Sequence, residues 1–292
     1  MKDRVMDLAY AFGWTAVRKL PESFSRTVFD RIADRVWRKR GKGVLQLEKN
    51  LSRVVPGLSE PELRQLSRKG MRSYLRYWLE AFRLPEMSRE RVLQVVAEGE
   101  DEIFKNLEAG RGVICALPHT GNYDHAGAWI TYLGAPFTTV MERLKPESLY
   151  ERFVAYRESL GMEILPLTGS AVSVMGTLAR RLREGRLVCL VADRDLSATG
   201  IEVDFFGRPA RMPGGSAALA VQTGAALLPA TLWYEGERWG IRIHEEVPVP
   251  EDGTRKEKIA AMTQSLANAF AEGIAAHPED WHMMQRVWVE DL

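Results

Sequence analysis

The sequence has only two cysteines among its 292 residues, Cys115 and Cys189. Each lies inside an apolar run, where a small buried thiol is the usual arrangement. There is no CxxC pair and no Cys/His spacing of the zinc type, so neither a disulfide framework nor a structural metal site is indicated. We therefore expect no metal, and reduced thiols in a protein of the cytoplasm.

Long hydrophobic runs are also missing. No segment reaches the roughly 18 apolar residues that a membrane-spanning helix needs. Lys2 and Arg4 precede a short apolar stretch, but Asp7 interrupts it and no small-residue cleavage site follows, so we expect no signal peptide. The formal net charge is only +1. A protein without a strong positive field is not expected to bind nucleic acid.

Several catalytic signatures are absent as well. The chain has no Walker A motif and no GxGxxG, which removes support for nucleotide and dinucleotide folds. A GxSxG nucleophile elbow is missing too, because Gly214-Gly215-Ser216 lacks the closing glycine. His119 and His125 are spaced wrongly for two ligands on one helix face, and no third metal ligand stands out.

Charge is present but unevenly placed. Residues 1–90 hold 20 Lys/Arg against 11 Asp/Glu, a balance of +9, whereas residues 91–292 hold 20 against 28, a balance of −8. A basic end on a nearly neutral chain suggests an anionic partner, either lipid headgroups or a polyphosphate. A solvated helical face is the alternative interpretation.

The basic portion, residues 1–90, is predicted to be helical. Apolar residues recur at helical spacing from Phe24 to Trp37, with arginines on the other faces, and residues 8–20 are amphipathic as well. This pattern is typical of a helix lying in a membrane interface, although a helix packed on a protein core would show it too. Trp14 and Trp37 are the candidate interfacial anchors.

From about residue 110 the chain alternates between strand-like and helical patterns, as in a β-α-β array. We expect strands at Val113–Pro118, Phe137–Met141, Glu163–Leu167, Leu187–Ala192, Ala226–Tyr234 and Gly240–His244. We expect helices at 63–82, 122–132, 147–160, 171–184, 214–224 and 256–276. The predicted fold is α/β, with a mostly parallel central sheet flanked by helices and with N-terminal amphipathic helices. One domain is expected over residues 1–292, made of a helical portion (1–90) and an α/β core (91–292).

The stretch His119-Thr-Gly-Asn-Tyr-Asp124 joins the first expected strand to the next helix. On a continuous helix, five residues at about 100° each would place the two side chains roughly 140° apart, so they would not meet. They can pair only if His119 lies in the turn before the helix and Asp124 in its first turns. A carboxylate bonded to one imidazole nitrogen leaves the other free to take a proton. The alternative is a histidine that merely ends a strand.

Polar side chains directly follow three of the expected strands: His119 with Asp124, Glu142 with Arg143, and Asp193 with Arg194. If the strands are parallel, these residues meet at one rim of the sheet, where ligands bind in open α/β folds. Each alone is also an ordinary loop residue. No Ser or Cys nucleophile accompanies the histidine and its carboxylates. We therefore expect His119 to act as a base on a substrate hydroxyl, which would form an ester from an activated acyl group.

The same stretch matches the HX4D motif of the glycerolipid and lipid A acyltransferase superfamily. Other segments resemble the phosphatidylinositol mannoside acyltransferases within it: Tyr77-Trp-Leu-Glu-Ala-Phe-Arg-Leu84, Glu142-Arg-Leu-Lys-Pro-Glu-Ser148, Tyr156-Arg-Glu-Ser-Leu-Gly161, Val203-Asp-Phe-Phe-Gly207 and Arg211-Met-Pro213. Asp280-Trp-His-Met283 is similar to the tryptophan-rich ending of lipid A acyltransferases. The resemblance covers nearly the whole chain.

This resemblance implies an acyl-CoA-dependent O-acyltransferase, bound peripherally to an anionic membrane surface at the cytoplasmic face of the cell membrane. It implies transfer of a palmitoyl-type chain from acyl-CoA to the 6-hydroxyl of the 2-linked mannose of phosphatidylinositol mannosides. No cofactor is implied beyond the acyl-CoA donor.

The resemblance also assigns roles. His119 is the base, Asp124 belongs to its motif, and Glu142 and Arg157 line the pocket. The family usually has Glu where this chain has Asp193, and that carboxylate is expected to pair with the catalytic histidine. Because Asp is one methylene shorter, either the backbone lies closer or the contact is less direct. Whether Asp193 or Asp124 is the main partner of His119 stays open.

The sequence also offers candidate residues that would bind the polar part of the substrate and the oxyanion of the intermediate. Arg143, Arg157 and Arg194 are expected to contact a phosphate or hydroxyls. Backbone N–H groups near Gly121 and Asn122 are expected to receive the oxyanion. Two alternatives to the mannoside enzyme remain: a lipid A-type or lysophospholipid acyltransferase of the same superfamily, and a non-catalytic lipid-binding protein.

Overall fold

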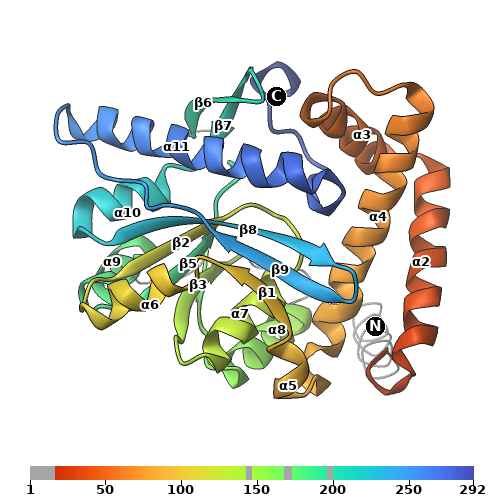
Figure 1. Cartoon of the computed structure of the whole chain (residues 1–292), viewed down its shortest axis with the longest axis horizontal. Helices are drawn as coiled ribbons and strands as arrows, with labels where there is room; N and C mark the ends of the chain where they lie inside the picture. Colours follow the sequence, from red (N-terminus) through yellow and green to blue (C-terminus); the bar gives the residue numbers. More distant parts are fainter. Residues whose placement is uncertain (1–16, 143–146, 168–172, 196–199) are drawn as a thin grey trace.

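The computed structural model describes residues 17–142, 147–167, 173–195 and 200–292 (Figure 1). Its helices are α2 (Glu22–Lys39), α3 (Lys42–Val54), α4 (Glu60–Arg83), α5 (Arg89–Val92), α6 (Asp101–Glu108), α7 (Tyr123–Tyr132), α8 (Glu147–Ser159), α9 (Val174–Arg183), α10 (Gly215–Thr223) and α11 (Arg255–Ala276). Its strands are β1 (Val95–Glu98), β2 (Val113–Leu117), β3 (Phe137–Met141), β4 (Glu163–Pro166), β5 (Leu187–Val191), β6 (Ile201–Phe205), β7 (Arg208–Met212), β8 (Ala226–Glu235) and β9 (Arg238–Ile243). Short 3-10 turns cover Leu84–Glu86, Pro278–Asp280 and Val289–Asp291.

In the described part of the chain, a seven-stranded sheet has the order β1-β9-β8-β2-β5-β3-β4. Every neighbouring pair is parallel except β8 and β9. The prediction of a mostly parallel α/β fold is therefore confirmed, and all six expected strands are present. Sequence reasoning missed β1 and the antiparallel hairpin β6–β7. These strands are short and partly exposed, so they lack the continuous apolar run of a buried parallel strand.

Strand β2 lies near the middle of the sheet, and all five of its residues are buried. Ile114 and Ala116 face a core cluster shared with α9, α10 and α11. Val113, Cys115 and Leu117 face a second cluster shared with α6, α7 and α8. Helices α10 and α11 therefore cover one face of the sheet and α7 and α8 the other (Figure 1). This two-sided burial explains the uninterrupted apolar run that predicted β2.

Helices α2, α3 and α4 pack on one another at one side of the sheet, around a small apolar cluster that includes Leu47 and Met71 (Figure 1). Trp37 belongs to this packing, because its Nε1 donates to Ser67 at 3.0 Å and the Arg64 guanidinium lies 4.0 Å from its ring centre. This packing gives half-buried Trp37 a structural role, and its role as a membrane anchor stays a prediction. Trp14, the other predicted anchor, lies outside the described residues.

The outer side of α2 carries exposed apolar residues at regular spacing: Phe24 is 55% exposed, Ile32 43% and Val36 40%. Arg31 and Arg35, on the same helix, are exposed as well. The helix therefore presents apolar and basic side chains together. No helix of the described ranges combines the length and apolar character that crossing a bilayer requires.

Candidate active site

The register of two parallel strands brings His119 and Asp193 together. Strand β2 lies beside β5, and Leu117 pairs with Val191. His119 and Asp193 each follow two residues later, so they leave the sheet side by side. His119 Nδ1 lies 2.5 Å from Asp193 Oδ1, and the His119 backbone N–H donates to Asp193 Oδ2 at 2.9 Å. Asp193 is thus the carboxylate that pairs with His119, and its shorter side chain still makes direct contact.

Asp193 is fully buried and has a third donor, because Trp281 Nε1 donates to its Oδ2 at 3.0 Å. Burial alone would raise the pKa of Asp193, but attraction to the His119 imidazole and the donated hydrogen bonds lower it below its ordinary value. An ionised carboxylate at Nδ1 favours the tautomer that carries its proton there. Nε2 then keeps its lone pair, on a side chain that remains 28% exposed.

A segment near the C-terminus fixes the loop that carries His119. The His119 carbonyl accepts from the His282 N–H at 2.8 Å, and Thr120 forms an isolated bridge with Trp281. Gly121, at φ 51°, donates its N–H to the Asp280 carbonyl at 2.9 Å. That N–H is already bonded, so the expectation that it would receive an oxyanion is not supported.

Sequence reasoning missed the structural role of Trp281. The resemblance had singled out Asp280-Trp-His-Met283 without assigning any of its residues a function. Trp281 is 88 positions away from Asp193 along the chain, so no local spacing could relate the two. The only signal in the sequence was the resemblance itself.

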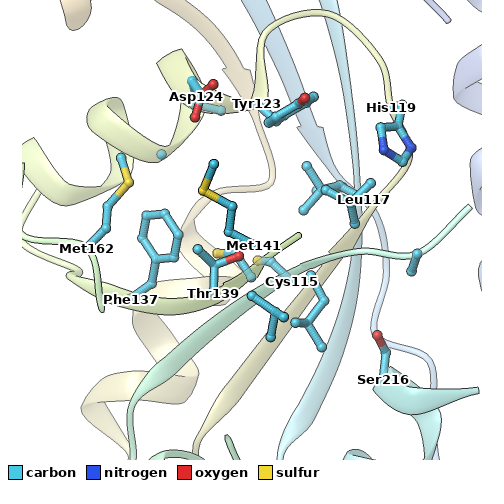
Figure 2. Close-up of a pocket in the computed structure, with 18 of the residues that line it drawn as sticks. Cys115, Leu117, His119, Tyr123, Asp124, Phe137, Thr139, Met141, Met162 and Ser216 are labelled. Carbon is cyan, nitrogen blue, oxygen red and sulfur yellow. The ribbon is translucent and has the colours of Figure 1, made fainter. Parts of the chain in front are cut away.

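Asp124 has different partners from those expected within its own motif. It lies in the first turn of α7 and is 4% exposed. Arg157 of α8 donates Nε to Asp124 Oδ1 at 2.8 Å, and Tyr77 of α4 donates its hydroxyl to Oδ2 at 2.9 Å. In Figure 2, Tyr123 lies between the Asp124 carboxylate and the His119 ring. Of the two carboxylates left open as the partner of His119, Asp193 makes the contact, whereas Asp124 bonds to Arg157 and Tyr77.

Arg157 lines the cavity, but Asp124 neutralises its charge. Burial alone would lower the pKa of Arg157, whereas the Asp124 carboxylate raises it above its ordinary value. The guanidinium is therefore a permanent cation within a buried ion pair. It is less available to a substrate phosphate than the sequence suggested.

Two further polar residues of this region shape the turn. Asn122 caps α7 by accepting the His125 N–H at 2.9 Å, and its side-chain amide donates to buried Glu80 at 2.8 Å. The His125 ring stacks on Trp239 with 3.6 Å between ring centres. Burial lowers the pKa of His125 to about 3, so this histidine is neutral at physiological pH. It supports the turn by packing, and its ring does not share the environment of His119.

Arg194 and Glu142 lie together at the carboxyl edge of the sheet. Arg194 Nη2 lies 3.5 Å from Glu142 Oε2, and Nη1 donates to Gln285 Oε1. Both residues line the same cavity as His119. The structure thus joins Glu142 and Arg194 at the predicted rim. Arg143 lies outside the described residues.

His119 lies at the edge of a cavity of about 1130 Å³, large enough for a long ligand. Its lining on the α7 side is mostly apolar and includes Cys115, Leu117, Phe137, Met141 and Met162 (Figure 2). On the other side, apolar residues such as Val174, Leu178 and Leu190 line the cavity together with polar Ser173, Arg194, Asp195, Ser216 and Gln285. The cavity therefore has an apolar arm and a more polar arm, with the histidine at its edge.

The two arms lie on opposite faces of the sheet, where strands β3 and β5 separate. Their pairing ends at Thr139 and Cys189, although β3 stays paired with β4 up to Met141 and β5 with β2 up to Val191. The chain leaves β3 for α8 on one face, whereas after β5 it passes through the hairpin β6–β7 to α10 on the other face. Open α/β sheets bind their ligands at the point where the connections from two neighbouring strands run to opposite faces of the sheet.

Known proteins resemble this chain along nearly its whole length. A family model of bacterial lipid A biosynthesis acyltransferases matches residues 1–290. A phosphatidylinositol mannoside acyltransferase of Mycolicibacterium smegmatis is 49% identical over 292 residues, which cover 99% of this chain and 93% of that protein. A phosphatidylinositol mannoside acyltransferase of Mycobacterium tuberculosis is 51% identical over 291 residues, covering 98% of this chain and 89% of the relative. The chain accordingly belongs to the bacterial lipid A biosynthesis acyltransferase family.

Proposed function

We propose that this acyltransferase moves a long-chain, palmitoyl-type acyl group from acyl-CoA to the 6-hydroxyl of the 2-linked mannose of phosphatidylinositol mannosides. The observation that carries the proposal is the His119–Asp193 pair at the edge of the large apolar cavity. The relatives' names support this acceptor over the other acceptors of the family. The protein acts as a peripheral enzyme at the cytoplasmic face of the membrane.

The reaction follows from the chemistry of His119. Its Nε2 removes the proton of the mannose hydroxyl while the oxygen attacks the thioester carbonyl. Asp193 holds Nδ1 and stabilises the imidazolium that forms. When the tetrahedral intermediate collapses, the C–S bond breaks and CoA leaves as a thiolate, which takes the proton back from His119. The ester product and free CoA account for every atom, and no step calls for a metal or another cofactor.

The two arms of the cavity suit the two ends of such a reaction. The apolar arm accommodates the acyl tail, which the hydrophobic effect holds there. The more polar arm, with Arg194 between Glu142 and Gln285, accommodates hydroxyl and phosphate groups. Asp124 contributes by positioning α7 and α8 against each other through Arg157, away from the reacting atoms.

Helix α2 supplies the membrane contact in this proposal. Its exposed Phe24, Ile32 and Val36 can enter the interface while Arg31 and Arg35 meet anionic headgroups.

The proposed acceptor is tested by incubating the protein with radiolabelled palmitoyl-CoA and a panel of mannosides, lysophospholipids and lipid A precursors. Label in a mannoside, released as an ester of the mannose 6-hydroxyl, supports the proposal. Label only in a lysophospholipid or lipid A precursor would assign the chain to another branch of its family. Binding of palmitoyl-CoA without transfer to any acceptor or to water would leave only a lipid-binding role.

A further inference from the structure

We propose that Ser73 of α4 is a positioning residue that keeps the His119–Asp193 pair in the arrangement that takes up the acceptor's proton. Its hydroxyl acts through Asp280 and His282, which lie near the C-terminus. The inference rests on the proposed function and adds a residue to it. Ser73 is 8% exposed and is not among the residues that line the cavity. Any effect that it has on the reaction must therefore pass through its partners.

The hydroxyl of Ser73 joins two side chains from the other end of the chain. A serine inside a helix usually turns its hydroxyl to solvent or to the carbonyl one turn earlier. Ser73 lies within the 24-residue helix α4, yet its Oγ donates to Asp280 Oδ1 at 2.6 Å and lies 2.8 Å from His282 Nε2. Burial raises the pKa of Asp280 to about 6, so at neutral pH its carboxylate is mostly ionised and accepts this bond. The Ser73 oxygen can then accept from His282 Nε2–H.

The two partners of Ser73 also hold the backbone of the loop that carries the base. The Asp280 carbonyl accepts from the Gly121 N–H at 2.9 Å. The His282 N–H donates to the His119 carbonyl at 2.8 Å. A shift of Asp280 or His282 would therefore move this loop, and the imidazole of His119 with it.

Trp281, the residue between these two partners, holds the other member of the pair. Its side chain is fully buried, and its Nε1 donates to Asp193 Oδ2 at 3.0 Å. Because Asp280 and His282 fix the backbone on both sides of Trp281, they also fix the direction from which the indole meets Asp193. Ser73 thus supports both members of the pair through one segment of three residues.

Ser73→Ala removes the hydroxyl and suits a helix, because alanine has the highest helix propensity. We expect the kcat of palmitoyl transfer to phosphatidylinositol mannoside to fall about ten- to hundredfold, because a small misplacement of reacting groups can cost roughly 10²-fold. The KM for palmitoyl-CoA should stay within about twofold, since Ser73 does not line the cavity. Ser73→Thr keeps the hydroxyl and should keep most of the kcat.

Ser67→Ala is the matched control. Ser67 lies on the same helix and is fully buried. Its hydroxyl also joins two side chains, because it accepts from Trp37 Nε1 at 3.0 Å and donates to Glu48 Oε1 at 3.2 Å. These partners belong to the packing of α2, α3 and α4, away from His119. Urea unfolding should show a loss of stability in both alanine variants, whereas kcat should fall only in Ser73→Ala.

The decisive measurement repeats Ser73→Ala in a protein that already carries Asp193→Ala. If Ser73 acts through the His119–Asp193 pair, the second substitution should cost less than about threefold in kcat, because groups that act as one unit are not additive. Equal fold losses in the two backgrounds overturn the inference. An unchanged kcat in folded Ser73→Ala, or an equal loss in Ser67→Ala or Ser73→Thr, overturns it as well, and each of these results leaves transfer by the wild type intact. A wild-type protein that transfers palmitoyl neither to an acceptor nor to water overturns the proposed function instead.

Discussion

At the scale of single residues, the sequence predicted the chemical groups of the site but left the carboxylate partner of His119 open. His119 and Asp193 were both placed at strand ends, and parallel register then brings them together. Asp124 is the nearest carboxylate in the sequence, yet it turns into the protein to meet Arg157. The hydrophobic pattern of the sequence predicts where a residue lies along its helix or strand. It does not predict which distant helix packs against that residue, and this decides the partner of a buried charge such as Asp124.

Because Asp124 neutralises a buried cation, Asp124→Asn should act on stability. Removing one partner leaves the Arg157 charge uncompensated, which costs roughly 3–5 kcal/mol of unfolding free energy. Glu163→Gln is the control, because it weakens a more exposed pair with Arg181 and should cost about 1 kcal/mol or less. Urea unfolding of both variants measures the difference. Equal costs would contradict a structural role for the Asp124–Arg157 pair.

Asp280 offers a prediction about pH. It is buried, accepts hydrogen bonds from Ser73 and from the Tyr234 backbone, and its burial raises its pKa to about 6. In the unfolded chain an aspartate titrates near a pKa of about 3.9, so the folded state binds this proton more tightly. The stabilisation that this proton provides is fully present below about pH 4 and is lost as the pH rises to 6.

Asp280→Asn removes this titration while keeping one acceptor and one donor for the same partners. The unfolding free energy of the variant minus that of the wild type should rise by about 2 kcal/mol between pH 4 and pH 7. Urea unfolding at several pH values measures the difference, in which the contributions of all other groups cancel. A difference that does not change with pH would show that Asp280 keeps an ordinary pKa in the folded protein.

At the scale of elements, long apolar runs were the reliable signal. Strands β2 and β8 are buried over all or most of their length, β3 and β5 are buried where they begin, and each was predicted within a residue or two. The hairpin β6–β7 alternates exposed and buried residues over five positions per strand, which is too short for a confident pattern. Helix α2 was predicted as a helix, but the sequence did not reveal that Trp37 turns inward while Phe24 stays exposed.

The exposed side of α2 should bind anionic membranes. A double substitution, Phe24→Ser with Ile32→Ser, removes two exposed apolar side chains, each worth about 1.5–3 kcal/mol when buried. Flotation with phosphatidylinositol-containing vesicles measures the bound fraction of the protein. We expect the partition coefficient calculated from it to fall at least tenfold in the double variant. Leu133→Ser, which removes an apolar side chain exposed elsewhere, is the control. High salt should weaken the wild-type binding by screening the arginines. Equal binding by the wild type and the double variant would contradict this contact.

At the scale of the whole molecule, residues from both ends of the chain support the site. Asn50 of α3 is fully buried and donates to the carbonyls of Met283 and Gln285, at 2.7 and 2.9 Å. The C-terminal segment then holds the His119 loop and Asp193. The N-terminal helices are therefore linked to the catalytic edge through this segment (Figure 1). Contacts across more than two hundred positions leave no local pattern, so only the folded structure reveals them.

The central claim is that His119, oriented by Asp193, is the base. Its most direct test is palmitoyl transfer to phosphatidylinositol mannoside by His119→Ala, alongside palmitoyl-CoA binding by the same variant. Removing a general base costs about 10²–10⁴ in rate, and the apolar residues proposed to hold the acyl tail line the cavity independently of the imidazole. We predict transfer reduced by about that factor with binding of palmitoyl-CoA unchanged. Transfer at the wild-type rate in that variant would contradict the account.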